Sequence, residues 1–186
     1  MDNGESSYRR FSETGDEDAF AYLIYTYRDG LTFYLNSFVG DLHVAEELCE
    51  DTFVLLGTKK PKNRGGATFK TWLYTIGRNI ALNHLRRKKR KGEVSLDDVS
   101  DREDCDADVV RSFLLDEQKI MLHRAMKKLK PEYRQVLWLY YFEELPFRDI
   151  ARIMKRTPHS AETLAYRARG ALKKLLEKEG FIYEKL

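Results

Sequence analysis

The sequence predicts an all-α protein in which two small helical domains are joined by a flexible acidic linker. Apolar residues recur at helical spacing along most of the 186-residue chain, and no convincing strand or repeat appears. This spacing is lost over residues 92–112, where Asp, Glu and Ser accumulate. Charge changes at the same place, because residues 86–91 are six consecutive cations and residues 92–110 carry a net charge of −7. The predicted domains span residues 8–91 and 113–180.

The first predicted domain opens with a long amphipathic helix. Thr14 to Glu17 has the form of a capping box, in which the first and last side chains bond each other's backbone N–H groups. Apolar residues then recur at helical spacing from Phe20 to Phe38, until Gly40-Asp41 breaks the pattern. A second helix is expected from about Leu42 to Leu56, with an acidic outer face.

A cationic loop and a third helix complete this domain. The loop runs from Gly57 to Ala67 and contains lysines, an asparagine, an arginine and a glycine pair. The third helix is predicted from Thr68 to about Arg90, with a core stripe that begins at Phe69 and includes Trp72. Its last turns are almost entirely cationic.

The second predicted domain ends in a helix-turn-helix. Helices are expected from near Phe113 to Leu129 and from Tyr133 to Tyr141. A short helix from Pro146 to Met154 is then followed by a turn and a second helix, which Thr157 caps and Pro158 opens. Such a second helix can lie in the DNA major groove. An ordinary helical hairpin with a basic solvated face would show the same pattern.

The sequence shows no signature of an enzyme, a membrane protein or a secreted protein. No apolar run approaches the ~20 residues that a spanning helix needs, and the segment MDNGESSYRR lacks the apolar core of a signal peptide. Cys49 and Cys105 lie far apart and fit free thiols in a reducing cytoplasm. The four histidines are isolated, and no phosphate-binding glycine loop or nucleophile elbow occurs. We expect a cytoplasmic protein without catalytic residues, metal or cofactor.

Several motifs in a fixed order resemble a known family. DEDAFAYLIYTYRDGLTFYL, AEELCEDTF and FKTWLYTIGRNIALNHLRR precede the linker, and LKPEYRQVLWLYYFEELPFRDIARIM and YRARGAL follow it. Together they resemble the small bacterial sigma factors of the extracytoplasmic-function group, over nearly the whole chain outside the linker and the extreme termini. The resemblance implies a sigma region 2 bundle, a region 4 helix-turn-helix, and a protein that directs core RNA polymerase to promoter DNA.

The resemblance implies that AEELCEDTF docks on the clamp helices of the largest polymerase subunit. Such an interface combines a central anchor with a charged rim, although most acidic helix faces are simply solvated. Glu50 stands where the family usually has Gln. The expected polymerase-binding residues are Glu46, Glu47, Glu50 and Asp51 as the rim and Phe53 as the apolar anchor.

The resemblance assigns strand separation at the minus-ten promoter element to the cationic loop and the third helix. Pulling a base from the stack costs a few kcal/mol, which stacking, base-edge hydrogen bonds and phosphate contacts offset. The cations of residues 86–91 are expected to contact phosphates without reading sequence, and Trp72 is expected in the core. The expected minus-ten residues are Lys62, Asn63, Arg64, Arg78, Asn79, Asn83, Arg86 and Arg87.

The resemblance assigns the minus-thirty-five element to the second helix of the helix-turn-helix. The family usually has Gly-Thr-Val-Lys-Ser-Arg-Leu there, and in this chain Glu162 and Leu164 replace the two cations. Glu162 can accept a hydrogen bond from cytosine, but its charge repels phosphates. The expected residues of this surface are Arg156, His159, Ser160, Glu162, Thr163, Tyr166 and Arg167.

Two other functions remain open. A two-domain helix-turn-helix regulator would bind duplex DNA without polymerase, and would need neither an acidic docking helix nor a strand-opening loop. An adaptor would bind only protein through the basic helix. The resemblance further implies an anti-sigma factor as a partner beside core RNA polymerase and promoter DNA, with no membrane insertion.

Overall fold

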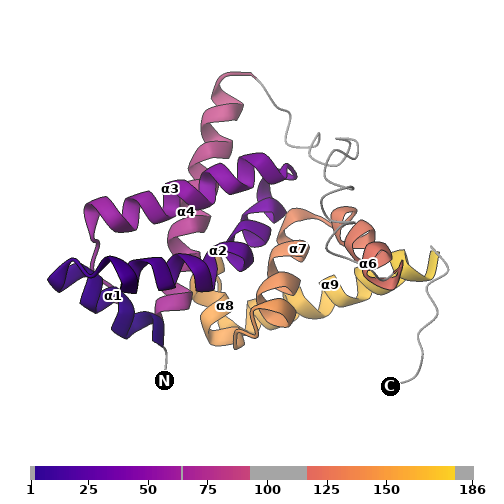
Figure 1. Cartoon of the computed structure of the whole chain (residues 1–186). Helices are drawn as coiled ribbons and strands as arrows, with labels where there is room; N and C mark the ends of the chain where they lie inside the picture. The colour runs from indigo at the N-terminus through magenta and orange to yellow at the C-terminus, as the bar shows by residue number, and fades with distance from the viewer. Residues whose placement is uncertain (1–2, 64, 93–116, 179–186) are drawn as a thin grey trace.

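The structure is a computed structural model that describes residues 3–63, 65–92 and 117–178. Within these ranges it is helical and contains no strand, which confirms the predicted all-α fold (Figure 1). None of the helices described is long and apolar enough to cross a bilayer. The first bundle contains α1 (Asn3–Thr14), α2 (Glu17–Val39), α3 (Leu42–Lys59) and α4 (Phe69–Arg90). The second contains α6 (Glu117–Lys127), α7 (Pro131–Leu137), η2 (Trp138–Phe142), α8 (Phe147–Met154) and α9 (Pro158–Lys178).

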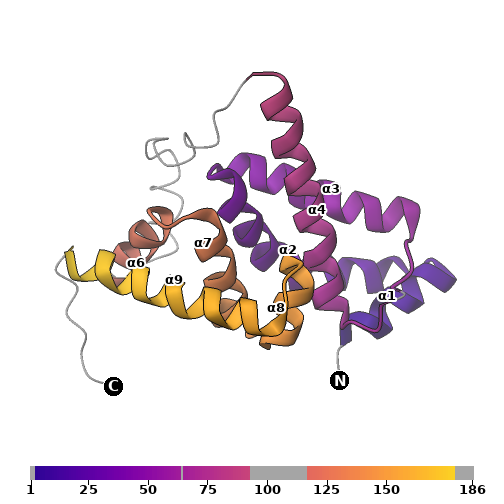
Figure 2. The same cartoon turned by 180° about the vertical axis from the view of Figure 1, so that it is seen from behind.

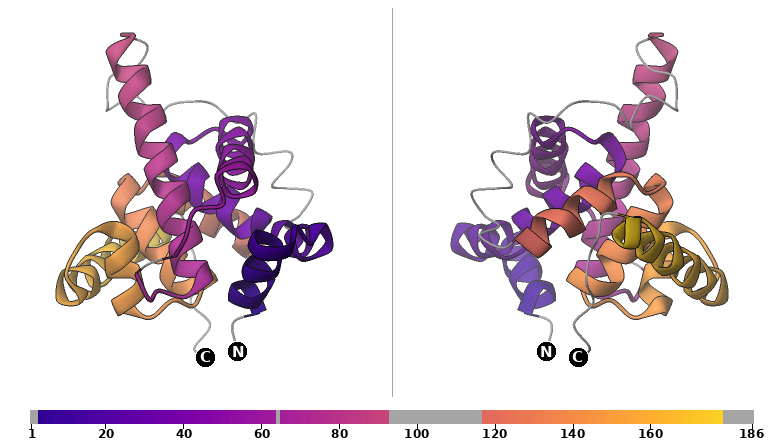
Figure 3. Two further views of the ribbon diagram at one scale, coloured as in Figure 1. Left: turned by 90° about the vertical axis from the view of Figure 1, so that its left-hand side faces the viewer. Right: turned by 90° about the vertical axis from the view of Figure 1, so that its right-hand side faces the viewer.

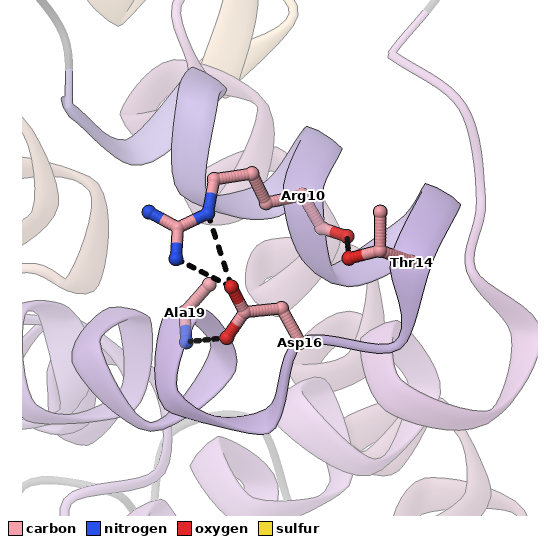
Figure 4. A network of polar contacts seen from close by, with 4 residues as sticks. All are labelled: Arg10, Thr14, Asp16 and Ala19. Carbon is pink, nitrogen blue, oxygen red and sulfur yellow. Dashed lines mark hydrogen bonds and ion pairs between the residues drawn. The ribbon is translucent and has the colours of Figure 1, made fainter.

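The predicted capping box at the start of α2 is wrong. Asp16 is the N-cap, because its Oδ1 accepts the backbone N–H of Ala19 at 2.9 Å (Figure 4). Thr14 instead belongs to α1 and donates its hydroxyl to the carbonyl of Arg10 at 2.7 Å. Gly15, in the left-handed region at φ 73°, turns the chain between the two helices. The Ala19 N–H, and then the Arg10 guanidinium, hold the pKa of the Asp16 carboxyl below its usual value.

The other helix boundaries of the first bundle lie close to the predicted ones. Gly40 ends α2 at φ 67°, and Asp41 caps α3 by accepting the N–H of Val44 at 3.3 Å. Thr68 caps α4 through the N–H of Thr71 at 3.2 Å. The last turns of α4 project beyond the rest of the bundle (Figures 1 and 3). This projection leaves the cationic end of α4 accessible from several sides.

The second bundle contains a π-helix where the sequence predicts a regular helix. The predicted element from Tyr133 to Tyr141 becomes α7 followed by η2, in which the N–H of Glu143 bonds the carbonyl of Trp138 at 3.2 Å. Short π-helical segments occur mostly as single turns at functional places. Here the wider turn brings Glu143 back against Trp138, whose indole N–H donates to Glu143 Oε1 at 3.1 Å.

The two bundles pack against each other through one continuous hydrophobic core. Helices α2 and α4 face α7, η2 and α8 at this contact, which Figure 2 shows from behind. Lys70 of α4 forms an ion pair with Glu143 at 2.8 Å, and the rings of Phe33 and Trp138 lie 5.5 Å apart. The buried guanidinium of Arg134 donates to the carbonyl of Ser37 at 3.0 and 3.3 Å. The predicted linker lies outside the described residues, apart from Gly92.

Candidate nucleic-acid interface

The loop between α3 and α4 is closed by one of the residues expected to read DNA. The side-chain amide of Asn63 donates to the carbonyl of Ala67 at 2.7 Å, which ties the two sides of the loop together. Lys62 is exposed beside it, whereas Arg64 lies outside the described residues. Asn63 therefore shapes the loop through its side-chain N–H group, and its side-chain oxygen is left for a contact with DNA.

Side chains of helix α1 contact this loop, and these contacts were not predicted from the sequence. Tyr8 donates its hydroxyl to the carbonyl of Pro61 at 2.9 Å, and Lys60 Nζ lies 4.6 Å from the centre of the Phe11 ring. Burial raises the pKa of Tyr8 to about 12, so this hydroxyl keeps its proton at neutral pH. The three-residue spacing of Tyr8 and Phe11 before Gly15 was the available sequence signal.

Four of the residues on α4 form one stripe along the helix. Asn79, Asn83, Arg86 and Arg90 are separated by four, three and four positions, which places them on one face. Arg86 donates to Asn83 Oδ1 at 3.4 Å. Asn83 and Arg86 are exposed and Asn79 is half-buried, so the stripe offers amide groups first and cations toward the C-terminal end. This order suits base edges followed by phosphates.

Arg78 and Arg87 flank this stripe on opposite sides. Arg78 is half-buried, and its Nε has no hydrogen-bond partner within the described structure. Arg87 is exposed and lines a groove of about 570 Å³ between the start of α3 and the end of α4. The groove is lined by Val44, His84, Arg87, Lys88, Arg90 and Lys91. Its cationic wall fits a phosphate backbone rather than a base.

The helix-turn-helix is present as predicted. Lys155, in the left-handed region at φ 55°, ends α8, and Thr157 Oγ1 accepts the N–H of Ser160 at 3.2 Å, as expected of the cap. The buried face of α9 is Ala161, Leu164, Ala165, Ala168 and Leu176, with Leu172 and Leu175 half-buried. Leu164, one of the two residues that stand where the family usually has a cation, is therefore buried and packs in the core.

The outward face of α9 carries most of the residues expected at the minus-thirty-five element. His159, Glu162 and Tyr166 are exposed along one stripe, with Tyr166 72% exposed, and Arg167 is exposed beside it. Thr163 is half-buried. The stripe continues to the exposed cations Arg169 and Lys173.

Two of the residues expected on this surface contact each other instead. Arg156 Nη1 lies 3.4 Å from Ser160 Oγ, and Arg156 Nη2 forms an ion pair with Glu132 of α7 at 2.7 Å. Both residues are half-buried. Arg156 therefore braces the turn against α7, and its charge is shared with Glu132.

The acidic face of α3 is exposed, but its expected apolar anchor is not. Glu47, Glu50 and Asp51 are exposed, and Glu46 lies 3.7 Å from the imidazole of His43. Phe53 is only 6% exposed.

The burial of Phe53 contradicts its expected role as a surface anchor. Phe53 packs against Phe20 with the ring centres 6.4 Å apart, because α2 packs against α3. Val54, 60% exposed, is the large apolar side chain that α3 presents to solvent.

No group of three His, Cys, Asp or Glu residues in the described ranges is arranged to hold a metal ion. Cys49 is a buried free thiol, and its burial raises the pKa of the thiol. Within the described residues, functional groups therefore concentrate on three faces: acidic on α3, mixed amide and cationic on α4, and mixed on α9.

Comparisons with known proteins identify both bundles. The family model for sigma-70 region 2 matches residues 23–91, and that for sigma-70 region 4 matches residues 119–172. The chain is 30% identical to the RNA polymerase sigma-H factor of Pseudomonas aeruginosa over 173 residues, covering 89% of this chain and 90% of that protein. It is 28% identical to the ECF RNA polymerase sigma factor SigW of Bacillus subtilis over 172 residues, covering 87% and 91%.

Solved structures show the same fold. The sigma factor RpoE in complex with the anti-sigma factor NepR from Bartonella quintana aligns with a TM-score of 0.64 at 19% identity, covering 85% of this chain and 96% of that one. CnrH in complex with the cytosolic domain of CnrY aligns with a TM-score of 0.66 at 20% identity, covering 95% and 99%.

Proposed function

Because the chain belongs to the sigma-70 family, in its extracytoplasmic-function group, we propose that its exposed faces divide the work of promoter recognition. The protein is an alternative sigma factor that binds core RNA polymerase and directs promoter-specific transcription initiation. In our proposal region 2 spans residues 8–91 and region 4 spans residues 113–180. Helix α3 docks on polymerase, the loop with α4 opens and reads the minus-ten element, and α9 reads the minus-thirty-five element.

The observation that carries this division is the separation of charge between α3 and α4. The outer face of α3 is acidic and repels DNA, whereas the stripe on α4 contains amide and cationic side chains, which can bind DNA. A regulator that bound only duplex DNA would have no use for an exposed acidic helix in the same bundle. In place of the buried Phe53, we propose Val54 as the apolar contact at the centre of the α3 face.

The contact between the bundles must open when the protein acts. The two promoter elements are separated by about 25 base pairs, roughly 85 Å of B-DNA at about 3.4 Å per pair. In the structure α4 packs directly on α8, so the stripe on α4 and the outer face of α9 cannot reach both elements at once. We propose that docking on polymerase separates α4 from α8 and fixes the spacing of the two readers.

An anti-sigma factor is proposed as a further partner. RpoE and CnrH, which share the fold, were both solved with proteins that bind them. A sigma factor acts where RNA polymerase acts, so we place the protein in the cytoplasm.

The test reverses charge on the α3 face. The double variant Glu47→Lys with Asp51→Lys should lower affinity for core polymerase roughly tenfold or more, because two rim charges then oppose the partner. The matched control is Glu13→Lys with Glu177→Lys, which reverses two exposed acids outside α3. Both variants should keep the helical circular dichroism of the parent protein.

Pull-down of core polymerase and run-off transcription measure the outcome. Loss in the α3 variant with retention in the control supports the proposed docking face. Equal co-purification of both variants would refute that face. Promoter affinity that is the same with and without polymerase would favour the plain DNA-binding regulator.

A further inference from the structure

We infer that Tyr8 of α1 is a positioning residue that holds the loop between α3 and α4 in the shape needed to read the minus-ten element. This inference rests on the proposed function of that loop. It concerns a residue outside the matched region 2 segment, which begins at residue 23. Tyr8 acts through the loop backbone and itself contacts no DNA in this account.

One side chain touches both ends of the loop. The hydroxyl of Tyr8 donates to the carbonyl of Pro61, where the chain leaves α3. Its ring lies 5.5 Å from Phe69 and 5.1 Å, edge-on, from Trp72, in the first turn of α4. Tyr8 is 7% exposed, so its ring is fixed by packing on all sides. The distance between the loop ends is therefore set by α1.

A second contact from α1 sets the direction in which the chain enters the loop. Lys60 adopts the left-handed region at φ 42°, and its ammonium lies over the Phe11 ring and 3.5 Å from the Phe11 carbonyl. Phe11 is held in turn by stacking on Phe20 at 4.3 Å. The left-handed conformation is unfavourable for a lysine, so these contacts help to select it.

The described residues at the tip of the loop have few other contacts. Gly65 and Gly66 are exposed, and a Cβ added at either would meet no atom within 4 Å. Apart from the Asn63 bond to Ala67, the described tip has a long 3.5 Å contact from Arg152 of α8 to the Gly66 carbonyl. That contact is lost if the bundles separate, as proposed above. In the open protein the loop then depends on α1.

The test is Tyr8→Phe in the complete holoenzyme, with Tyr25→Phe as the matched control. Tyr25 is 89% exposed on α2, so the control removes a hydroxyl without removing a buried contact. Loss of one net hydrogen bond corresponds to roughly a fivefold change in an equilibrium. Tyr8→Phe should therefore lower open-complex formation on a duplex promoter about fivefold and flatten the base preference at the minus-ten element. The control should leave both unchanged.

Three readouts separate positioning from a merely structural role. A template already melted at the minus-ten element should restore part of the loss, and polymerase affinity should remain that of the parent protein. Amide hydrogen exchange in the free protein should rise in the segments flanking the loop tip, residues 60–63 and 65–68, but not in the middle of α2 or α3. An equal loss on every promoter variant, or faster exchange throughout the bundle, would overturn the inference.

The outcomes also distinguish failure of the Tyr8 inference from failure of the proposed function on which it rests. If the parent protein fails to initiate with core polymerase, the proposed function fails first. If the parent initiates and Tyr8→Phe behaves as Tyr25→Phe does, the function stands and the role of Tyr8 is refuted.

Discussion

The loop in the first bundle and the helix-turn-helix in the second serve the same kind of recognition but are held in place differently. The turn before α9 is held by residues close to it in sequence. Thr157 caps α9 by accepting the N–H of Ser160, and Arg156 contacts both Ser160 and Glu132, which lies 24 residues before Arg156. The loop before α4 has a local bond from Asn63 to Ala67, but its junction with α3 is held by Tyr8, which lies 53 residues before Pro61. A short segment of sequence can therefore specify the helix-turn-helix, whereas the loop depends on a helix outside the matched region 2 segment.

This difference affects how each reader responds to damage. Disturbance of the packing among α1, α2 and α4 should reach the loop, because its shape is taken from that packing. Disturbance on the outer face of α9 should alter contacts with DNA and little else, since that face takes no part in the core. The four predictions that follow break or sharpen this contrast, from the largest expected effect to the smallest.

Alkaline pH should have the largest effect, through tyrosines of the first bundle. Burial raises the pKa of Tyr8 to about 12 and raises the pKa of Tyr34 and Tyr74 above the usual 10. Their contribution to stability is complete below about pH 10 and is lost progressively as the pH rises above 10, because the unfolded chain releases these protons first. The free energy of unfolding should fall by up to about 1.4 kcal/mol per pH unit for each tyrosine.

Denaturant titrations between pH 8 and pH 12 measure this slope. Tyr34→Phe should make it shallower, since that ring keeps its burial but no longer ionises. A slope unaffected by that substitution would show that the ring contributes nothing to alkaline unfolding.

Gly77→Val should destabilise the first bundle by about 2–3 kcal/mol. A Cβ at Gly77 would lie 2.9 Å from Leu31 Cδ1 and 3.5 Å from Leu35 Cδ2, so α4 would be pushed away from α2. Thermal unfolding followed by circular dichroism should show the loss, and open-complex formation should fall with it. A variant as stable as the parent would mean that α2 and α4 have room to separate without disturbing the core.

Glu162→Lys should change how α9 binds DNA without changing stability. The side chain is exposed on the outward stripe, and the substitution changes the local charge by two units. General affinity should rise, with the logarithmic salt slope steeper by about one. If Glu162 accepts from cytosine, discrimination at one base pair should drop by roughly 1–3 kcal/mol.

Affinity of the holoenzyme against salt, on minus-thirty-five duplexes with single-base changes, measures both effects. Arg169→Lys, which keeps the charge nearby, serves as the control. If neither salt slope nor base preference moves, Glu162 does not face DNA.

Gly170→Ala should give the smallest effect, a gain of about 0.5–1 kcal/mol in stability. Gly170 lies within α9 and is exposed, and an added Cβ would meet nothing within 4 Å. The gain comes from a better helix former at an open position. Chemical denaturation measures it, and a loss of stability would show that α9 needs flexibility at this point.

The sequence predicted the parts of the fold that depend on local periodicity and missed those that depend on distant packing. The inward face of α9 and the cap at Thr157 were predictable, because helical spacing and capping residues act within a few positions. Phe53 was misplaced because helical spacing does not reveal that Phe20 of another helix covers it. The role of α1 beneath the loop was missed for the same reason, since nothing near Pro61 points to Tyr8. The roles expected of individual residues toward DNA and polymerase stay predictions.

The bond between Arg134 and the Ser37 carbonyl has a consequence for synthesis of the protein. Its two partners are 97 residues apart, so the ribosome needs about 5 to 20 seconds between making one and making the other. During that interval the first bundle can fold, but the surface around Phe33 and Ser37 lacks its cover of α7 and η2. Nascent chains on one messenger would present this patch to one another. Slow translation of the second half should therefore favour aggregation during synthesis, even though the finished chain is well packed.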